Sequence, residues 1–483
     1  MVPNRGEIAV RIARACREMG IVSVLAHAED DDIGFTGRFF DETVSLGKGD
    51  ARETYLHVGK VIDAARATGA DALHPGYGFL SERAELSAAC EEAGIVFIGP
   101  KASSIAAMGS KAESRRLMQS LGVPVVPGYD GEDQSLETLT REAAGIGFPL
   151  LVKASAGGGG KGMKIVRARE ELQPAIESAA REAKKAFGDD RLLLERYIEE
   201  PRHVEFQVFG DGRGEVLHLF ERDCSIQRRH QKVIEESPAP RYPEELRARM
   251  AKAAVAAAAG VDYRNAGTVE FIVTPDGEFY FLEMNTRLQV EHPVTELVTG
   301  VDLVRAQIDV ASGRPLPWTQ AQLAQRGHAI EVRIYAEDPD NRFLPQSGTI
   351  AVYREPGGPG VRVDAGVTRG SEISIRFDPM LAKLICYAAD RESCIDRMSR
   401  ALRDYVILGT RTNTSWLRRV ITHPAFRDGR VSTRFLQDHE AELQPRVPDA
   451  VPDIAAALAS LPRRAPATAQ ARVASVWELV GRR

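Results

Sequence analysis

The sequence predicts an α/β and α+β protein of several domains, with an N-terminal doubly wound parallel sheet and a C-terminal mixed α+β domain built on an antiparallel sheet. The chain has 483 residues, too many for one core, and at roughly 100 to 200 residues per domain it should hold three or so. Helical and strand patterns alternate at the start, and a strand pair joined by a turn lies between Gly267 and Glu291. We expect domains at 1–108, 109–202 and 203–444, followed by a linker or tail at 445–483.

Composition places the chain among ordinary globular proteins. Its hydrophobic and charged fractions are 43% and 27%, and its net charge of -5 gives no electrostatic basis for binding nucleic acid. The five cysteines lack the spacing of metal ligands, which favours a reducing compartment. Because the sequence has no stretch of 18 apolar residues and no basic-then-apolar leader, we expect a soluble, cytoplasmic protein without a membrane partner.

The first hundred residues alternate helices with short strands. An apolar helical face over Gly6–Met19 ends at Gly20, and Ile21–Leu25 follows as a strand. The continuing alternation is typical of a doubly wound parallel sheet. Residues 1–4 are too few to supply a strand ahead of the first helix, so we expect that strand to be nearly absent, as in a truncated sheet. The segment His74–Gly78 follows a strand end, where α/β proteins often bind ligands, although a plain Gly/Pro turn also explains it.

Two short apolar strands, Pro149–Lys153 and Met163–Val166, frame a glycine-rich loop. Its four consecutive glycines, Gly157–Gly160, expose backbone N–H groups at low steric cost, and lysines at 153, 161 and 164 surround them. The loop is not a Walker A motif, because glycine follows Lys161 and a strand comes next. We interpret the loop as a cover for phosphate groups, with a flexible linker as the alternative.

Charged residues after position 200 allow structural and functional interpretations. His203, Glu205 and Gln207 share one face of a strand pattern, which predicts the wet side of a half-buried strand. The basic run Arg222–Lys232 fits a solvated loop, or a site that holds polyphosphate or a small anion. For Arg333, on a later strand, a structural salt bridge is the simplest role.

The most specific pattern is a hairpin whose second strand changes from apolar to polar. Four apolar residues, Phe279–Leu282, predict a buried strand, and polar residues then occupy alternate positions. A two-residue turn at Asp276–Gly277 would place Glu270 directly across from Glu283.

Two carboxylates opposed on neighbouring strands repel unless a cation lies between them. With Asn285 next to Glu283, the candidate ligands are all oxygen atoms, which suits Mg²⁺ or Mn²⁺. The hairpin therefore predicts a metal site made by Glu270, Glu283 and Asn285. A solvated polar face at a strand end is the alternative.

Taken together, the motifs resemble the biotin carboxylase component of biotin-dependent carboxylases, which has an ATP-grasp fold with a glycine-rich lid domain. The similarity runs from Asn4 to about Glu440 and is carried by HPGYGFLSE (His74 to Glu82), MGSK (Met108 to Lys111), KASAGGGGKGM (Lys153 to Met163), PRHVEFQV (Pro201 to Val208), RDCSIQRRHQKVIEE (Arg222 to Glu236) and EMNTRLQVEHPVTE (Glu283 to Glu296). The run Arg333–Pro339 is more similar to the α-subunits of acyl-CoA carboxylases.

The resemblance implies a role for each matching residue. ATP would be bound by Lys111, Lys153, Gly159, Gly160, His203, His230 and the backbone of Glu195, Arg196, Tyr197 and Ile198. Two Mg²⁺ ions would be held by Glu270, Glu283 and Asn285. Bicarbonate would be seated by Lys232, Arg287, Gln289 and Val290, with Glu291 as the base and Arg333 as the group that stabilises the biotin enolate.

The activity implied is ATP-dependent carboxylation of biotin by bicarbonate through carboxyphosphate. The sequence holds no biotin-attachment motif of the Ala/Glu-Met-Lys-Met kind, so the biotin carrier would be another polypeptide or a C-terminal part absent here. The resemblance also implies a carboxyltransferase subunit and a homo-oligomer as partners. Another ATP-grasp carbon–nitrogen ligase, or a non-catalytic nucleotide-binding subunit of a carboxylase, remains the alternative.

Overall fold

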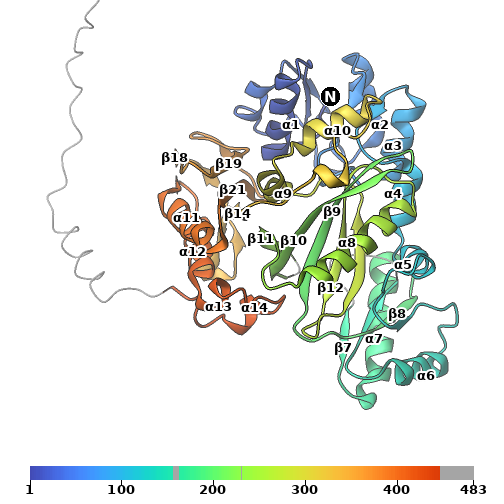
Figure 1. Cartoon of the computed structure of the whole chain (residues 1–483). Helices are drawn as coiled ribbons and strands as arrows, with labels where there is room; N and C mark the ends of the chain where they lie inside the picture. Colours follow the sequence, from blue (N-terminus) through green and yellow to red (C-terminus); the bar gives the residue numbers. More distant parts are fainter. Residues whose placement is uncertain (156–162, 230, 446–483) are drawn as a thin grey trace, which may run out of the picture. The chain divides into compact units, whose positions relative to one another are not determined.

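The computed structural model describes residues 1–155, 163–229 and 231–445. The chain divides into two compact units, Met1–Leu443 and Gln444–Arg483, and the fold described below is that of the first (Figure 1). Within the described residues, every helix is too short or too polar to cross a membrane. The predicted tail, except for its first residue, lies outside the described residues.

Parallel strand pairs form the N-terminal region, as the alternation predicts. Strand β1 pairs with β2 and β3 with β4, and Met1 and Val2 lie between the two pairs. Val2 bridges to Leu25 in parallel, and Met1 accepts a hydrogen bond from the His74 N–H at 3.0 Å. The first strand is thus reduced to a single bridge. The elements of this region are α1 (Gly6–Glu18), β1 (Val24–His27), η1 (Thr36–Phe39), β2 (Glu42–Ser45), α2 (Val58–Ala67), β3 (Ala72–Leu73), α3 (Ala84–Glu92), β4 (Val96–Phe97) and α4 (Ala102–Gly109).

A four-stranded antiparallel sheet of order β5-β8-β6-β7 follows. The two strands predicted around the glycine-rich loop are present as β6 and β7, and the glycines themselves lie outside the described residues. Apolar side chains such as Leu139, Val152 and Leu194 form a small core between the sheet and its helices. The elements are α5 (Lys111–Ser120), β5 (Gly128–Tyr129), α6 (Leu136–Ile146), β6 (Leu150–Ala154), β7 (Lys164–Val166), η2 (Arg169–Glu171), α7 (Leu172–Phe187) and β8 (Leu192–Arg196).

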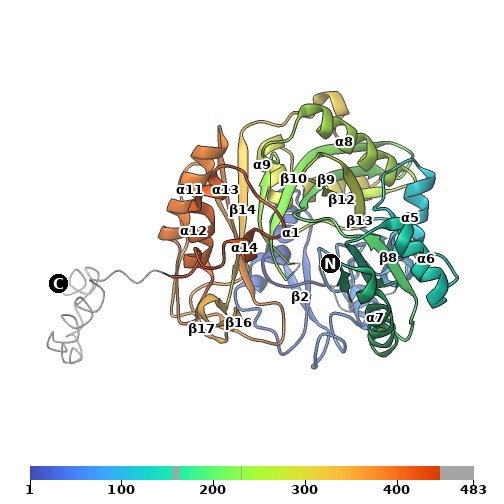
Figure 2. The ribbon, with the colours of Figure 1, turned by 90° about the horizontal axis from the view of Figure 1, so that it is seen from below.

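The largest element is an antiparallel sheet of order β13-β12-β9-β10-β11-β14-β21-β19. Its strands are β9 (Arg202–Asp211), β10 (Val216–Arg228), β11 (Gln231–Ser237), β12 (Arg264–Val273), β13 (Phe279–Asn285), β14 (His328–Tyr335), β19 (Val361–Ala365) and β21 (Met380–Ala388). In both ribbon views α11 to α14 gather at one end of this sheet, and α5 to α7 lie toward the other (Figures 1 and 2).

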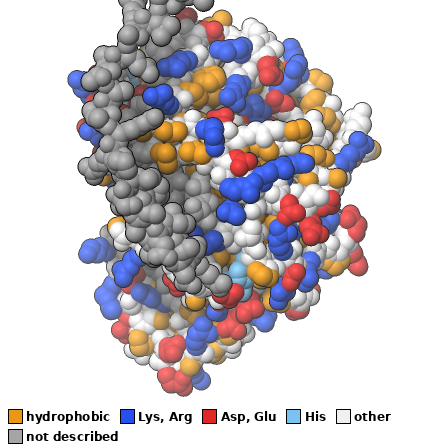
Figure 3. Space-filling view, turned by 90° about the vertical axis from the view of Figure 1, so that its left-hand side faces the viewer, with side chains coloured by type: hydrophobic (Ala, Val, Ile, Leu, Met, Phe, Trp, Pro, Cys, Tyr) orange, Lys and Arg blue, Asp and Glu red, His pale blue; other side chains and the backbone are white. Residues whose placement is uncertain are grey.

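The helices that follow the four-stranded sheet in the chain are α8 (Glu244–Ala259), α9 (His292–Thr299), α10 (Leu303–Ala311), η3 (Gln320–Gln322), η4 (Pro339–Asn341), α11 (Arg391–Asp404), α12 (Thr414–Thr422), α13 (Pro424–Arg427) and α14 (Phe435–Asp438). Short strand pairs complete the fold: β15 (Glu337–Asp338) with β16 (Leu344–Pro345), β17 (Gly348–Thr349) with β20 (Glu372–Ile373), and β18 (Val352–Arg354) with β22 (Val406–Leu408). On the face shown in Figure 3, basic, acidic and apolar side chains are interspersed.

Strand β9 is buried on both faces, which corrects the prediction of a wet side. Val204 and Phe206 pack into a core with Met250 and Ala254 of α8. Because side chains alternate along a strand, His203, Glu205 and Gln207 point to the opposite face. There they are 7%, 0% and 0% exposed, because Arg222 of β10 binds Glu205 and Gln207 on that face and is itself covered by Thr295 of α9.

The hairpin of β12 and β13 places Glu270 directly across from Glu283, as predicted, but by a different turn. The loop has three residues, Pro275–Gly277, and Gly277 adopts φ +86°, a left-handed conformation that glycine tolerates. Pairing beside the turn is offset by one position, because Phe271 faces Phe281, and a bulge at Leu282 restores the register. The longer turn and the bulge compensate each other.

Candidate active site

A row of charged side chains crosses four neighbouring strands. Glu270 on β12 lies between Glu283 on β13 and Glu205 on β9, and Glu205 lies across from Arg222 on β10. Arg222 is fully buried, and its guanidinium donates to Glu205 at 2.5 Å and to Gln207 at 2.8 Å. Glu283, on the edge strand, is exposed. Three carboxylates in register on neighbouring strands repel one another unless a cation lies among them.

The ammonium of Lys232, on β11, binds three carboxylates. Its Nζ lies 2.5 Å from Glu205, 2.6 Å from Glu270 and 2.8 Å from Glu291. Burial alone would lower the pKa of Lys232, but the three anions outweigh it and raise the pKa well above its usual value. Lys232 therefore supplies the cation that the opposed carboxylates of β9 and β12 require.

Glu291 is a buried carboxylate held between cations. It precedes α9, and one of its oxygens accepts from Lys232 while the other lies 3.0 Å from Arg333. Burial opposes its ionisation, yet Lys232, Arg333 and Arg222 together keep the pKa of Glu291 well below its usual value. Glu291 is consequently an anion at neutral pH.

The segment between β13 and α9 is bound to Glu270. Asn285 and Gln289 both donate to Glu270 Oε1, at 2.8 Å and 3.0 Å. Arg287 donates in turn to Gln289 at 2.7 Å and to Asn285 at 3.0 Å, and it pairs with Glu82 at 2.9 Å. These contacts bring the predicted anion-binding residues to one place, beside the carboxylate of Glu291.

The residues predicted to bind a metal ion are brought close together, but metal binding itself stays a prediction. Asn285 Nδ2 donates to Glu270 Oε1, Asn285 Oδ1 accepts from Arg287, and Glu283 lies directly across from Glu270 on the neighbouring strand. His203 also belongs to this group, because its Nε2 lies 2.7 Å from Glu270 Oε2 and the ligand atoms of His203, Glu205 and Glu270 lie within 4.8 Å of one another. This largely oxygen donor set fits a hard divalent cation.

Most of the described residues predicted to bind the nucleotide lie on and beside the four-stranded sheet, whereas His203 lies on β9 of the large sheet. Lys153 on β6 forms an ion pair with Glu195 on β8, and Arg115 lies 3.4 Å from the same carboxylate. The N–H groups of Arg196 and Tyr197 donate to backbone carbonyls at 2.8 Å and 3.0 Å, and Ile198 follows. Lys111 begins α5, whereas Gly159, Gly160 and His230 lie outside the described residues.

The basic run is not a solvated loop, because all its described residues except Arg229 lie in β10 and β11, and Arg222, Arg228 and Lys232 bind carboxylates. Binding of an anion there stays a prediction. Besides Arg222 and Lys232, Arg228 pairs with Glu337 at 2.6 Å. Arg333 has the salt bridge expected of it, 2.6 Å from Glu235, and it also contacts Glu291. Sequence reasoning missed Glu205 and Arg222 as members of the site. Their opposite charges on adjacent strands were the available signal.

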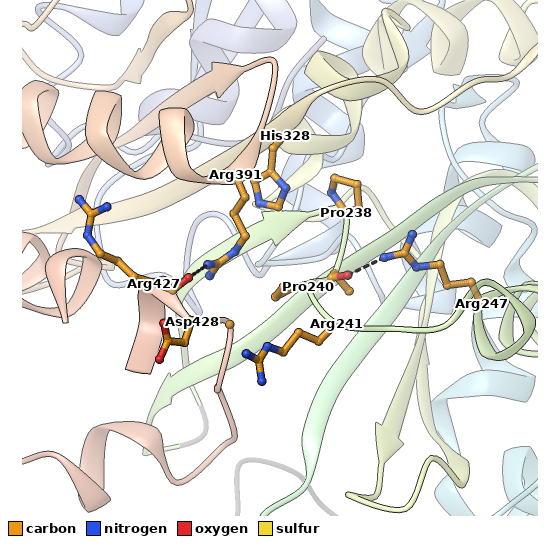
Figure 4. A pocket seen from close by; sticks show the side chains of 10 residues that line it. Pro238, Pro240, Arg241, Arg247, His328, Arg391, Arg427 and Asp428 are labelled. Carbon is orange, nitrogen blue, oxygen red and sulfur yellow. Dashed lines mark hydrogen bonds between the residues drawn. The ribbon is translucent and has the colours of Figure 1, made fainter. Parts of the chain in front are cut away.

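A pocket of about 340 Å³ lies among the loop after β11, the start of α11 and the end of α13 (Figure 4). None of the predicted site residues lines it. Its arginines are engaged with the protein itself: Arg391 binds Glu236 at 2.7 Å and donates to the Arg427 carbonyl, and Arg247 donates to the Ala239 carbonyl. These contacts join strand β11 to the C-terminal helices.

Three family models match most of the chain. They are the biotin carboxylase N-terminal domain over residues 1–105, the ATP binding domain of the carbamoyl-phosphate synthase L chain over 110–319, and the biotin carboxylase C-terminal domain over 331–438.

Curated relatives agree with these models. The mitochondrial methylcrotonoyl-CoA carboxylase subunit alpha of Dictyostelium discoideum is 50% identical over 95% of this chain, and that of Rattus norvegicus is 49% identical over 92%. The chain spans only 66% and 62% of these two relatives. The biotin carboxylase of a Nostoc species is 47% identical over 91% of this chain and 98% of its own length.

Solved structures match the fold closely. The biotin carboxylase domain dimer of Hydrogenobacter thermophilus 2-oxoglutarate carboxylase, in complex with MgADP, ADP and bicarbonate, has a TM-score of 0.87 and 47% identity, covering 92% of this chain and 98% of that one. The biotin carboxylase of Campylobacter jejuni, in complex with β,γ-ATP, also has a TM-score of 0.87, with 42% identity over 91% of this chain and 98% of that one. With matches of this extent, and with the charged residues of its motifs gathered at one site, the chain belongs to the biotin carboxylase family.

Proposed function

We propose that this protein is a ligase that carboxylates biotin with bicarbonate, using ATP and releasing ADP and phosphate. The observation that supports this most is the position of Glu291, a buried anion between Lys232 and Arg333 at the end of the segment that carries Arg287 and Gln289. A base enclosed by cations suits a substrate that is itself an anion and must lose a proton.

Charge dominates the barrier to this reaction, because phosphoryl transfer to bicarbonate joins two anions. Lys232, Arg287, Gln289 and the backbone of Val290 would seat bicarbonate, and Glu291 would take its proton as the oxygen attacks the γ-phosphate. The product, carboxyphosphate, breaks down to CO₂ and phosphate and needs a site without water. Phosphate then removes the N–H proton of biotin, and Arg333 would stabilise the resulting enolate while the nitrogen attacks CO₂.

ATP would be held mainly by residues of the four-stranded sheet and of the glycine-rich loop. The ammonium of Lys153, with Lys111, would bind the phosphates, and Gly159 and Gly160 would close over them. The backbone of Glu195, Arg196, Tyr197 and Ile198 would contact adenine, and His203 and His230 would line the nucleotide pocket. Mg²⁺, or Mn²⁺, held by Glu270, Glu283 and Asn285, would neutralise phosphate charge. The MgADP and bicarbonate bound to the Hydrogenobacter relative support these assignments.

Partners of the chain follow from the same family. We propose a biotin carrier protein or domain, a carboxyltransferase subunit, and a homodimer or larger complex. The dimer of the Hydrogenobacter relative and the size of the methylcrotonoyl-CoA carboxylase subunits support this. We also propose the domain division at residues 108, 202 and 444. The first and last boundaries lie near the ends of family models at 105 and 438, whereas 202 falls within the model over 110–319. The five cysteines, all buried and unpaired, support a cytoplasmic location.

The test is ATP hydrolysis with bicarbonate and Mg²⁺, with and without free biotin. We expect hydrolysis to require bicarbonate and to rise with biotin. Bicarbonate-independent hydrolysis, or hydrolysis that biotin leaves unchanged, would favour another ATP-grasp ligase. A chain that binds ATP but never hydrolyses it would instead be a non-catalytic nucleotide-binding subunit.

A further inference from the structure

Lys383, on β21, is a fully buried lysine to which the proposed reaction gives no role. Its Nζ donates to the carbonyl of Val290 at 2.8 Å and lies 3.2 Å from Glu7 Oε2. It sits directly across from Arg333 on β14 and from Asp364 on β19. Lys383 therefore extends the charged row toward the far edge of the large sheet, and its ammonium contacts the segment that carries Glu291.

Two motifs from the start of the chain hold this lysine. Glu7 comes from α1 and is 3% exposed, and its other oxygen, Oε1, accepts a hydrogen bond from the hydroxyl of Tyr77 in the His74–Gly78 turn. Helix α1 lies close against the end of β19: a side chain at Gly366 would meet the Gly6 backbone at 2.5 Å. Glu7 is thus placed next to Lys383 by close packing of the backbone.

The contact with Val290 differs from the other bonds of its segment. Arg287 and Gln289 join the segment through their side chains to Glu82 and to Glu270 on β12, whereas Lys383 binds the backbone of the segment. Lys383 instead joins the segment to β21, α1 and the Tyr77 turn at once. A buried carbonyl that lost this charged donor would be left without its partner, and the backbone around it would shift.

We propose that Lys383, oriented by Glu7 and Tyr77, is a positioning residue that fixes the Val290 carbonyl and thereby the seat of bicarbonate. The proposal rests on the proposed function, since it assigns the segment Arg287–Glu291 to bicarbonate. In this proposal, Glu7 and Tyr77 of the N-terminal region contribute to the binding of bicarbonate by orienting Lys383.

Three variants test the role: Lys383→Met, Tyr77→Phe, and the double variant Lys383→Met with Glu7→Gln. The measurement is steady-state ATP hydrolysis, with KM for bicarbonate, KM for ATP and kcat determined separately, alongside the thermal unfolding midpoint. In Lys383→Met we expect KM for bicarbonate to rise about 10-fold to 100-fold, as for loss of a charged hydrogen bond, with KM for ATP within about twofold. Tyr77→Phe should give a smaller shift in the same direction.

The double variant separates positioning from stability. Burial, opposed by Lys383, raises the pKa of Glu7 to about 7, so an unpaired Glu7 can take up a proton and the single variant should still fold. Removing both charges should recover the unfolding midpoint but leave KM for bicarbonate high. If the double variant recovered both the unfolding midpoint and the KM for bicarbonate, Lys383 would be merely structural and the proposal would be overturned. Equal losses in all kinetic constants would overturn it too.

The control is Arg314→Met, which removes an exposed cation paired with Asp309 and should change none of these values. If the unaltered protein shows no bicarbonate-dependent hydrolysis, the proposed function fails before the variants are compared. If it is active and Lys383→Met keeps the KM for bicarbonate of the parent, only the positioning role fails.

Discussion

Lys232 and Glu291 show how single residues define this site. Lys232 binds three buried carboxylates, and Glu291 is bound by two cations, so neither side chain can be removed without leaving opposite charges unpaired. The motif EMNTRLQVEHPVTE made Glu291 predictable, since the family resemblance assigns it. The two cations that lower its pKa most, Lys232 and Arg333, were also predicted site residues, whereas the part of Arg222 depends on the pairing of β9 with β10.

Glu291→Gln should lower kcat for bicarbonate-dependent ATP hydrolysis by about 10²-fold to 10⁴-fold, because an amide cannot take the proton of bicarbonate. ATP binding, measured by calorimetry, should be retained. Glu278→Gln, at the exposed turn between β12 and β13, is the matched control. Activity of Glu291→Gln equal to that of the control would exclude Glu291 as the base.

Lys232→Met should lower the free energy of unfolding by roughly 3 to 5 kcal/mol, the range for breaking a buried ion pair. The carboxylates of Glu205, Glu270 and Glu291 would lose their shared cation. Urea titration near neutral pH measures the change. A loss below about 1 kcal/mol would match an exposed pair and contradict the burial of this ammonium.

At the scale of elements, the hairpin of β12 and β13 was predictable, and so was the strand β9, but the burial of both faces of β9 was not. The opposed pair Glu270 and Glu283 followed from a turn signal and a count of residues, and it survives because the bulge at Leu282 cancels the error in the turn. A period of two in β9 suggested one wet face, but Arg222 and Lys232 from β10 and β11 pack against Glu205 on that face, and Glu205 is completely buried. Alternation tells which side chains share a face, and tertiary packing decides whether that face meets water.

Glu270→Gln should raise the Mg²⁺ concentration needed for half-maximal ATP turnover by about an order of magnitude, because a charged oxygen ligand is lost. The control is again Glu278→Gln. An unchanged Mg²⁺ dependence would mean that Glu270 serves only the ion pair with Lys232.

Glu236, a buried carboxylate on strand β11, makes the free energy of unfolding depend on pH. Burial opposes ionisation of Glu236, but Arg391 and His328 lower its pKa to about 2. The stability that this depressed pKa contributes is present above the ordinary value of about 4.5 and is lost as pH falls toward 2, a change of roughly 3 kcal/mol. The free energy of unfolding of the parent should thus fall more steeply below pH 4.5 than that of Glu236→Gln. Parallel pH profiles would contradict this.

At the scale of the molecule, three stretches far apart in the sequence meet around Glu291. Glu7 and Tyr77 come from the N-terminal region. Lys232 comes from the middle of the large sheet, Glu270 from the strand next to one edge and Lys383 from the strand next to the other edge. The N-terminal motifs were visible in the sequence, where a turn and a helix were the simplest explanations. Their connection to the site required the long-range packing of α1 against β19 and β21, which no local pattern encodes.

The most direct test of the account follows isotopic oxygen. With ¹⁸O-labelled bicarbonate, ATP, Mg²⁺ and biotin, phosphoryl transfer to bicarbonate should leave a labelled oxygen in the released phosphate, because carboxyphosphate breaks at its carbon–oxygen bond. Mass spectrometry of the phosphate detects it. Labelled phosphate formed together with carboxybiotin is the predicted result, and unlabelled phosphate from an enzyme that still turns over ATP would contradict the central claim.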